Sequence, residues 1–328
     1  QDMPPILRRP IVPGTLAFSA ALIGAGAGLA APRVAVDIAP VHSIVARVME
    51  GVDAPGLILR AGTSPHDYAL RPSDAALIDG ADVVVWVGPN MTPWMDGPID
   101  ALAGRAKVLM LDEAPGVTLL PARDAGPFEP DHHEGEGPEE AARPEGQKGG
   151  HGLDGMDGHV WLDPANAAAF AQAVAATLTE ADPEHAAVYE ANAAAFGAET
   201  TALSDEISSR LAPARGKPFL VFHDAYQYFE KRFDLPAAGS LALTDGEAPG
   251  AARIADLRAR IGAEGVVCAF AEPSFDPKLI ETVIEGSAVR AGTLDPEGIA
   301  LTPGPDLYPA LMRGLAESLA DCLAPKPE

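Results

Sequence analysis

The sequence predicts an α/β protein with two parallel-sheet α/β lobes joined by a long rigid helix. Short runs rich in β-branched residues alternate with helical segments before residue 123, and the alternation resumes after residue 218. Such alternation indicates βαβ units, in which the strands are parallel. Residues 166–211, between the two regions, are rich in alanine, which has the highest helix propensity. We therefore expect two lobes with a cleft between them, where ligands commonly bind.

The first lobe has a clear pattern of strands and helices. Residues 81–87 are almost all apolar, which predicts a strand buried on both faces of its sheet. The other expected strands are residues 33–38, 57–59 and 107–111. The expected helices, where apolar residues recur with helical periodicity, are residues 42–50, 72–79 and 99–102.

The second lobe repeats this pattern after the helical stretch 166–211, which Asp182-Pro183-Glu184 divides into two helices. The expected strands are residues 219–222, 239–243, 265–270 and 289–293. The expected helices are residues 225–233, 251–261, 277–286 and 308–322. We accordingly divide the chain into a first lobe at 32–165, a linking helix at 166–182 and a second lobe at 183–328.

Residues 123–158 interrupt the first lobe with a tract rich in Gly, Pro, Glu and Asp and without usable periodicity. Such a segment buries too little apolar surface to order itself, so we expect a flexible acidic loop. The loop carries His132, His133 and His151, which are candidates for an accessory metal site or for passing metal to the cleft. The alternative interpretation is a solvated linker.

The overall charge excludes one class of function. The chain of 328 residues has 47 acidic and 23 basic residues and a formal net charge of -24. Nucleic-acid binding needs a basic face, so no nucleic-acid partner is expected. The same acidity raises the local concentration of cations near the surface.

Residues 1–31 have the features of an export signal. Arg8 and Arg9 precede the largely apolar run 11–29, and small residues after that run offer a cleavage point. A transmembrane anchor is the alternative, which a proline and four glycines within the run disfavour. We expect a cleaved signal peptide, a periplasmic location and, because no cysteine follows the cleavage region, no lipid anchor.

The two cysteines, Cys268 and Cys322, are the only ones in the chain. An even number of cysteines in an exported protein predicts a disulfide bond between them. Two buried thiols are the alternative.

Three of the eight histidines, namely His66, His159 and His223, lie where an extended run meets a helix. The carboxyl ends of strands in α/β lobes form the ligand crevice. Three imidazoles brought there from distant parts of the chain suit Zn²⁺, which favours tetrahedral sites with nitrogen ligands. Each histidine taken singly is more often a capping or packed residue, so the joint placement carries the hypothesis.

The run around His159 is expected to be extended and to end at a helix start. Asp163 is suited to the N-cap position and Pro164 to the first helical position, which needs no backbone donor. In an extended run, Trp161 points to the same face as His159.

The chain resembles the ZnuA-type zinc-binding proteins of ABC importers, within the wider cluster of metal-binding solute receptors. The resemblance is carried, in order, by residues 66–74 (HDYALRPSD), 81–88 (ADVVVWVG), 159–164 (HVWLDP), 222–226 (FHDAY), 269–273 (AFAEP) and 293–296 (TLDP). The resemblance covers nearly all of the chain that follows the signal. The resemblance implies two α/β lobes, a backbone helix, a cleft that holds the metal and a histidine-containing loop before the second ligand.

The resemblance also implies a ligand set. The zinc ligands carried over by motif are His66, His159 and His223, and the fourth position belongs to water, Asp295 or a loop residue. Related manganese receptors typically have Glu at the position of His223, so a histidine there favours zinc. Some zinc members have Glu directly before the first ligand, where this chain has Pro65. For Asp295 the alternative role is a cap before Pro296.

Three acidic residues near these motifs are candidates for supporting roles. Asp67 and Asp224 each follow a candidate ligand, and we expect them to orient an imidazole or to cap a helix. Glu272, which precedes Pro273, is expected to have a buried structural role, and the alternative is that it faces the cleft.

The function that follows is capture of periplasmic Zn²⁺ by a monomer and delivery to the membrane permease of a zinc ABC importer. A zinc metallochaperone is a further candidate partner. The alternatives are a manganese-specific relative and a periplasmic zinc hydrolase with three histidine ligands. The chain has no HExxH helix, serine-centred elbow or phosphate loop, so we expect no enzyme.

Overall fold

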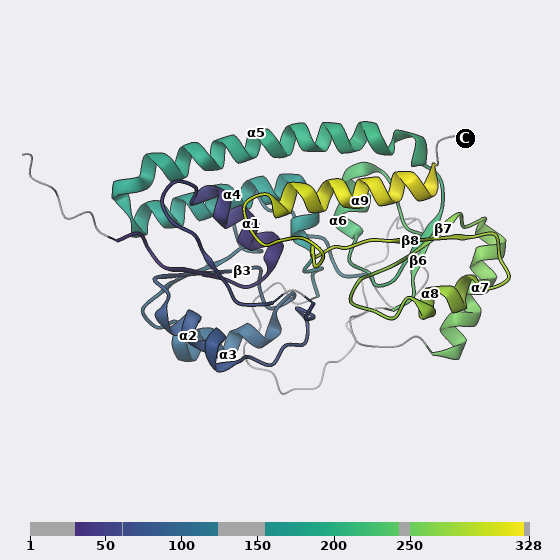
Figure 1. The fold of residues 1–328 in the computed structure, drawn as a ribbon, viewed down its shortest axis with the longest axis horizontal. Helices are drawn as coiled ribbons and strands as arrows, with labels where there is room; N and C mark the ends of the chain where they lie inside the picture. The colour runs from purple at the N-terminus through teal and green to yellow at the C-terminus, as the bar shows by residue number, and fades with distance from the viewer. Residues whose placement is uncertain (1–29, 61, 124–154, 243–249, 325–328) are drawn as a thin grey trace, which may run out of the picture. The chain divides into compact units, whose positions relative to one another are not determined.

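The computed structural model describes residues 30–60, 62–123, 155–242 and 250–324, and Figure 1 shows its fold. Nearly all of the expected signal peptide lies outside the described residues. Residues 124–154, which make up most of the expected acidic loop, lie outside them as well. In the part of the chain that is described, no helix is long and apolar enough to cross a membrane.

Four parallel strands form the sheet of the first lobe, in the order β2-β1-β3-β4. The strands are β1 (Val34–Val36), β2 (Gly56–Leu57), β3 (Val83–Trp86) and β4 (Lys107–Met110). The helices are α1 (Ala39–Val48), α2 (Pro72–Gly80) and α3 (Asp96–Leu102), with a short 3₁₀ helix η1 at Pro93–Met95. The βαβ pattern predicted for this lobe is confirmed.

Strand β3 is buried on both faces of this sheet. Alternate side chains of a strand point to opposite faces. Val83 and Val85 accordingly pack in the core that α1 covers, whereas Val84 and Trp86 pack in the core under α2 and α3. The nearly continuous apolar sequence of the strand follows from this double coverage.

The strands of this lobe are shorter than the runs that predict them, and hydrogen bonds to the sheet continue beyond the strand ends. Strand β2 ends at Leu57, although the next two N–H groups still donate to the first sheet. Ile58 donates to the carbonyl of Val36 at 2.8 Å, and Leu59 donates to that of Asp37 at 2.9 Å.

The second lobe repeats the first, with four parallel strands in the order β6-β5-β7-β8. The strands are β5 (Phe219–Val221), β6 (Gly239–Ser240), β7 (Cys268–Ala271) and β8 (Arg290–Thr293). The helices are α6 (Gln227–Phe233), α7 (Ala251–Glu264), α8 (Lys278–Ile284) and α9 (Leu307–Leu323). In both sheets the second strand along the chain lies at the edge, followed by the first, third and fourth.

Two long helices connect the lobes. They are α4 (Pro164–Ala181) and α5 (Ala186–Leu211), with 3₁₀ turns η3 (Pro183–His185) before α5 and η4 (Ala212–Ala214) after it. The break occurs where the sequence predicts it. Asp163 is the N-cap of α4, because its side chain accepts a hydrogen bond from Ala165 N at 2.8 Å, and Pro164 follows as expected. Helix α5 packs beside α4, α1 and α9 (Figure 1).

A single hydrophobic core runs through these helices into both lobes. It includes Val36 and Val85 of the first sheet, Phe219 and Phe270 of the second, and Phe196 of α5. Because packed interiors resist deformation, this shared core fixes the helices against the two sheets. The loops at the ends of the strands therefore start from a rigid frame.

The segment after His159 is a 3₁₀ helix, η2 (Val160–Leu162), and the expectation of an extended run is wrong. The i to i+3 bond from Leu162 N to His159 O, at 3.1 Å, closes the turn that leads into α4. Trp161 is fully buried, and its indole donates to Pro296 O at 2.9 Å. Its place is thus set by tertiary contacts of a turn and not by the alternation of a strand.

Cys268 in β7 and Cys322 in α9 form a disulfide bond, with their Cα atoms 6.2 Å apart. The predicted disulfide is confirmed, and the alternative of two buried thiols is wrong. The bond joins the central region of the second sheet to the last helix.

Candidate metal centre

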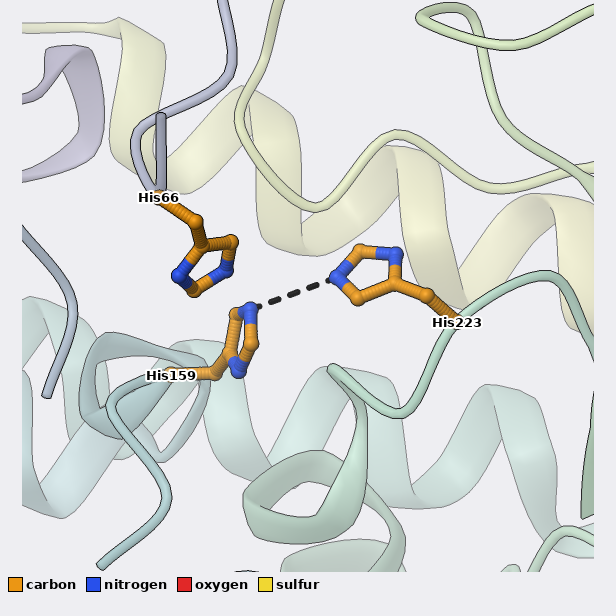
Figure 2. A group of neighbouring side chains, drawn as sticks. All are labelled: His66, His159 and His223. Atoms are coloured by element: carbon orange, nitrogen blue, oxygen red, sulfur yellow. Dashed lines mark hydrogen bonds between the residues drawn. The ribbon is translucent and has the colours of Figure 1, made fainter. Parts of the chain in front are cut away.

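Three histidines from distant parts of the chain lie together, and the convergence predicted from the sequence is confirmed. His66 lies between β2 and α2, His159 directly precedes η2, and His223 follows β5. One ligand atom from each lies within 4.8 Å of the other two. Figure 2 shows the three rings facing a common point. His159 and His223 are buried, and His66 is half-buried.

Neighbouring groups fix the segment that carries His66. The backbone N–H of His66 donates to the Ser64 hydroxyl at 3.2 Å. The carbonyl of Pro65 accepts a hydrogen bond from the indole of Trp94 at 2.7 Å. The ring of Trp94 in turn meets the ring of Tyr68 edge-on, with centroids 5.0 Å apart. These contacts attach the segment to η1 of the first lobe.

Two of the three imidazoles are held at Nδ1 by buried carboxylates. Asp157 Oδ1 lies 2.8 Å from Nδ1 of His159, and it also accepts from the His159 backbone N–H at 2.9 Å. Both carboxylate oxygens of Glu272 lie 2.8 Å from Nδ1 of His223. A carboxylate at Nδ1 fixes the ring and the tautomer, so that the lone pair of the neutral ring is at Nε2.

The two Nε2 atoms face each other. Nε2 of His159 lies 3.3 Å from Nε2 of His223 (Figure 2). If each Nδ1–H donates a hydrogen bond to its carboxylate, each Nε2 of a neutral ring has a lone pair. A hydrogen bond between the two Nε2 atoms then requires one of the rings to be an imidazolium. Otherwise their lone pairs suit a common cation. Two nitrogens bound to one tetrahedral zinc ion at about 2.0–2.1 Å lie about 3.3 Å apart. The site therefore fits zinc in both donor type and spacing.

Comparison with known proteins assigns the chain to a family. The family model described as "ZnuA: Zinc-uptake complex component A periplasmic" matches residues 34–322. The chain belongs to the ZnuA family. It is 47% identical over 315 residues to a high-affinity zinc uptake system protein ZnuA of Brucella suis, covering 91% of this chain and 94% of that one. It is 43% identical over 328 residues to the protein of the same name from Paracoccus denitrificans, covering 95% and 99%.

Solved structures of the ZnuA family share this fold. A crystal structure of ZnuA superposes with a TM-score of 0.73 at 21% identity, covering 90% of this chain and all of that one. A ZnuA deletion mutant with zinc bound superposes with a TM-score of 0.71 at 23% identity, again covering 90% of this chain. At these identities the likeness shows the fold, and the two-lobed α/β architecture predicted from the sequence is confirmed.

The carboxylates that hold the imidazoles differ from those that the sequence suggested. Asp67 is exposed, and Asp224 forms an ion pair with Arg123. Asp157, which the sequence placed in the acidic loop, contacts the imidazole of His159, and Glu272 contacts that of His223. Glu272 is buried as expected, and its contact with His223 agrees with the alternative that it faces the cleft. A signal for Asp157 existed in the spacing Asp-Gly-His directly before the second candidate ligand.

Asp295, the candidate fourth ligand, is engaged in a turn. Its Oδ1 accepts a hydrogen bond from Ile299 N at 3.0 Å, and its Oδ2 accepts one from Ala300 N at 3.1 Å. It is absent from the group of described residues whose ligand atoms cluster, which consists of the three histidines. The capping role, which was the alternative, accounts for both oxygens, and metal coordination by Asp295 stays a prediction.

The remaining histidines divide into two groups. His132, His133 and His151 lie outside the described residues, so their accessory metal site stays a prediction. His42 and His185 have structural contacts. Nε2 of His42 lies 3.0 Å from Pro55 O, and burial lowers its pKa. Nδ1 of His185 lies 2.7 Å from Asp182 Oδ2 at the break between α4 and α5.

Proposed function

We propose that the protein is a high-affinity zinc receptor that captures Zn²⁺ in the periplasm and delivers it to the permease of an ABC importer. The observation that carries the proposal is the pair of Nε2 atoms 3.3 Å apart on His159 and His223. Both imidazoles are oriented by a carboxylate, and His66 approaches the same point. The names of the family and of its relatives support transport of zinc as the purpose of this site.

Zinc is favoured over manganese by the donor set. Imidazole nitrogen suits zinc, whereas manganese prefers carboxylate and water oxygens. The carboxylates of Asp157 and Glu272 have oxygens that bond Nδ1 atoms on the far side of the rings. A manganese-specific relative is the alternative, and competition between the two metals distinguishes them.

A hydrolytic zinc site is disfavoured by the same carboxylates. A hydrolase needs a general base within reach of a metal-bound water. Asp157 and Glu272, which bond the rings of His159 and His223, lie on the Nδ1 side, away from the Nε2 atoms. We therefore propose a receptor and not an enzyme.

The zinc ion is the cargo of the proposed receptor, so it has to leave the site as well as enter it. His66 belongs to a segment that the first lobe holds, whereas His223 belongs to the second lobe. A shift of one lobe at the permease would separate these ligands. We propose a monomer that is exported by a cleaved signal peptide at residues 1–31, with a zinc metallochaperone as a second candidate partner.

Zinc titration of the chain and of its histidine variants tests this proposal. We expect tight 1:1 binding in the wild type and loss of that binding in His66→Ala, His159→Ala and His223→Ala. His185→Ala is the matched control, because His185 contacts Asp182 and lies outside the cluster. Unchanged affinity in the three cluster variants overturns the site, and a preference for manganese in competition overturns the choice of metal.

Deletion of residues 124–154 tests the part played by the expected loop. The deletion stops before Gly155 so that Asp157, which orients His159, is retained. We expect the tight site to survive and any weaker second equivalent of zinc to disappear. Loss of the tight site in this variant would contradict a site made by the three histidines.

A further inference from the structure

Asp157, which orients His159, is held by a short antiparallel pair of segments. Pro121 and Met156 form an antiparallel bridge. On either side of it, Asp157 N donates to Leu120 O at 2.8 Å, and Ala122 N donates to Gly155 O at 2.8 Å. Residues 120–122 and 155–157 are called the antiparallel pair below. Its geometry decides where the carboxylate of Asp157 lies.

Helix α6 contacts the antiparallel pair through two consecutive side chains. The Tyr228 hydroxyl donates to Asp157 O and accepts from Leu120 N, both at 2.9 Å, so it bridges the two segments. The amide of Gln227 donates to Pro121 O at 3.0 Å and to Asp157 Oδ2 at 3.3 Å. The second bond acts on the carboxylate whose other oxygen holds His159.

Arg123 directly follows residue 122 of the antiparallel pair, and its side chain contacts Asp224 and helix α6. Its guanidinium donates to Asp224 through Nε at 2.9 and 3.0 Å, and to Glu230 of α6 through Nη1 and Nη2 at 2.9 and 2.8 Å. The carboxylates of Asp224 and Glu230 are nearly buried. Bidentate arginine–carboxylate bonds are strong and geometrically specific, so they set the spacing of the groups they join.

The two elements joined by these bonds lie close in sequence to His223 and His159. Asp224 directly follows His223, and α6 begins four residues after that histidine. The antiparallel pair ends at Asp157, two residues before His159. The bonds between α6 and the antiparallel pair therefore connect the backbone of one ligand to the carboxylate that orients the other.

We propose that Arg123, Gln227 and Tyr228 are positioning residues for the metal site, which hold α6 against the antiparallel pair and so maintain the facing geometry of His159 and His223. The inference rests on the proposed zinc-binding function and adds a set of residues that do not touch the metal. Loss of a group that orients a ligand lowers metal affinity by roughly 10- to 100-fold, and we expect the lower end for these more remote bonds.

Tyr228→Phe, with Tyr189→Phe as control, is the first test. Both tyrosines are buried, and each change removes one hydroxyl; that of Tyr189 donates to Asp182 Oδ2 at 2.8 Å in the helix break. We expect Tyr228→Phe to weaken zinc binding roughly tenfold in chelator competition and to alter the visible spectrum of bound Co²⁺. Tyr189→Phe should lower the melting temperature while leaving zinc affinity and the Co²⁺ spectrum unchanged.

Arg123→Ala, with Arg313→Ala as control, is the second test. Both changes remove one positive charge, and Arg313 joins α9 to Glu206 of α5 by bonds of 2.9 to 3.1 Å. We expect weaker zinc binding in Arg123→Ala alone. Equal zinc affinities in the wild type, Tyr228→Phe and Arg123→Ala overturn the positioning role but leave the proposed function intact. A wild type that binds no zinc overturns both.

Discussion

Asp157 holds His159 across a single glycine. Its Oδ1 accepts hydrogen bonds from both the backbone N–H and Nδ1 of His159, at 2.9 and 2.8 Å. Gly158 between them lies against the chain at Asn90 and Met91, where an added Cβ would be 3.0 Å from backbone atoms. The Asp-Gly-His unit is thus fixed from within by the carboxylate and from outside by close backbone contact.

Asp157→Ala is expected to lower zinc affinity by about 10- to 100-fold, because the ring of His159 loses the acceptor that fixes its tautomer and direction. Chelator competition at constant pH measures the change. Asp276→Ala is the control, since it removes the same charge from an exposed residue whose carboxylate accepts from Lys278 N in the second lobe. Equal losses in the two variants would mean that Asp157 acts through net charge and not through His159.

Gly158→Ala should weaken zinc binding roughly tenfold, since the new methyl group displaces the backbone between Asp157 and His159. Calorimetric titration measures this loss. Gly197→Ala in α5 is the control, because a Cβ there has no neighbour within 4 Å. Alanine in a helix interior should raise stability by about 0.5–1 kcal/mol without changing zinc affinity. Wild-type affinity in Gly158→Ala would contradict the close fit.

The sequence predicted the parts of the fold that depend on local pattern. The apolar run that contains Val83 and Val85 predicted a strand covered on both faces, and Asp163 with Pro164 predicted the start of α4. These features follow from periodicity and capping, which short windows of sequence encode. A place in the ligand crevice was also predictable for His66 and His223, because each follows a parallel strand. His159 precedes a 3₁₀ helix, so this argument does not extend to it.

The groups that orient the ligands could not be predicted in the same way. Glu272 meets His223 across 49 residues, and Arg123 meets Asp224 across 101. Such contacts depend on side-chain direction after two elements have packed, and no local pattern encodes that direction. Composition also assigned Asp157 to the acidic loop, although it pairs with Leu120 and is buried.

Removal of the disulfide should destabilise the fold while leaving the metal site largely intact. The bond between Cys268 and Cys322 closes a loop with a sequence separation of 54, for which the chain-entropy model gives about 4 kcal/mol. Urea unfolding of the variant with Cys268→Ala and Cys322→Ala measures the loss. Zinc affinity should persist because β7, which precedes Glu272, stays paired with β5 and β8. Reductant should lower the free energy of unfolding of the wild type by the same amount and leave that of the double variant unchanged.

Asp37 should give the protein a component of stability that falls as the pH rises. Its side chain is fully buried directly after β1. Burial raises its pKa from 3.8 to about 6, although hydrogen bonds from Val87, Ile38 and Thr92 act to lower it. Between about pH 4 and pH 6 the folded carboxyl retains a proton that the unfolded chain has released. The folded state thus binds more protons, and the free energy of unfolding decreases with pH in this window.

Urea unfolding of the wild type and of Asp37→Asn at pH 4, 5, 6 and 7 isolates this contribution, because the asparagine does not titrate and the other groups are common to both proteins. We expect the free energy of unfolding of the wild type, relative to that of the variant, to fall by about 2 kcal/mol from pH 4 to pH 6. At pH 6 the folded carboxyl is about half ionised, so the difference should fall slightly further and become constant above about pH 7. A difference that is independent of pH throughout would show that Asp37 ionises normally in the folded protein. Its hydrogen bonds to Val87 and Ile38, both at 2.8 Å, would then outweigh the cost of burial.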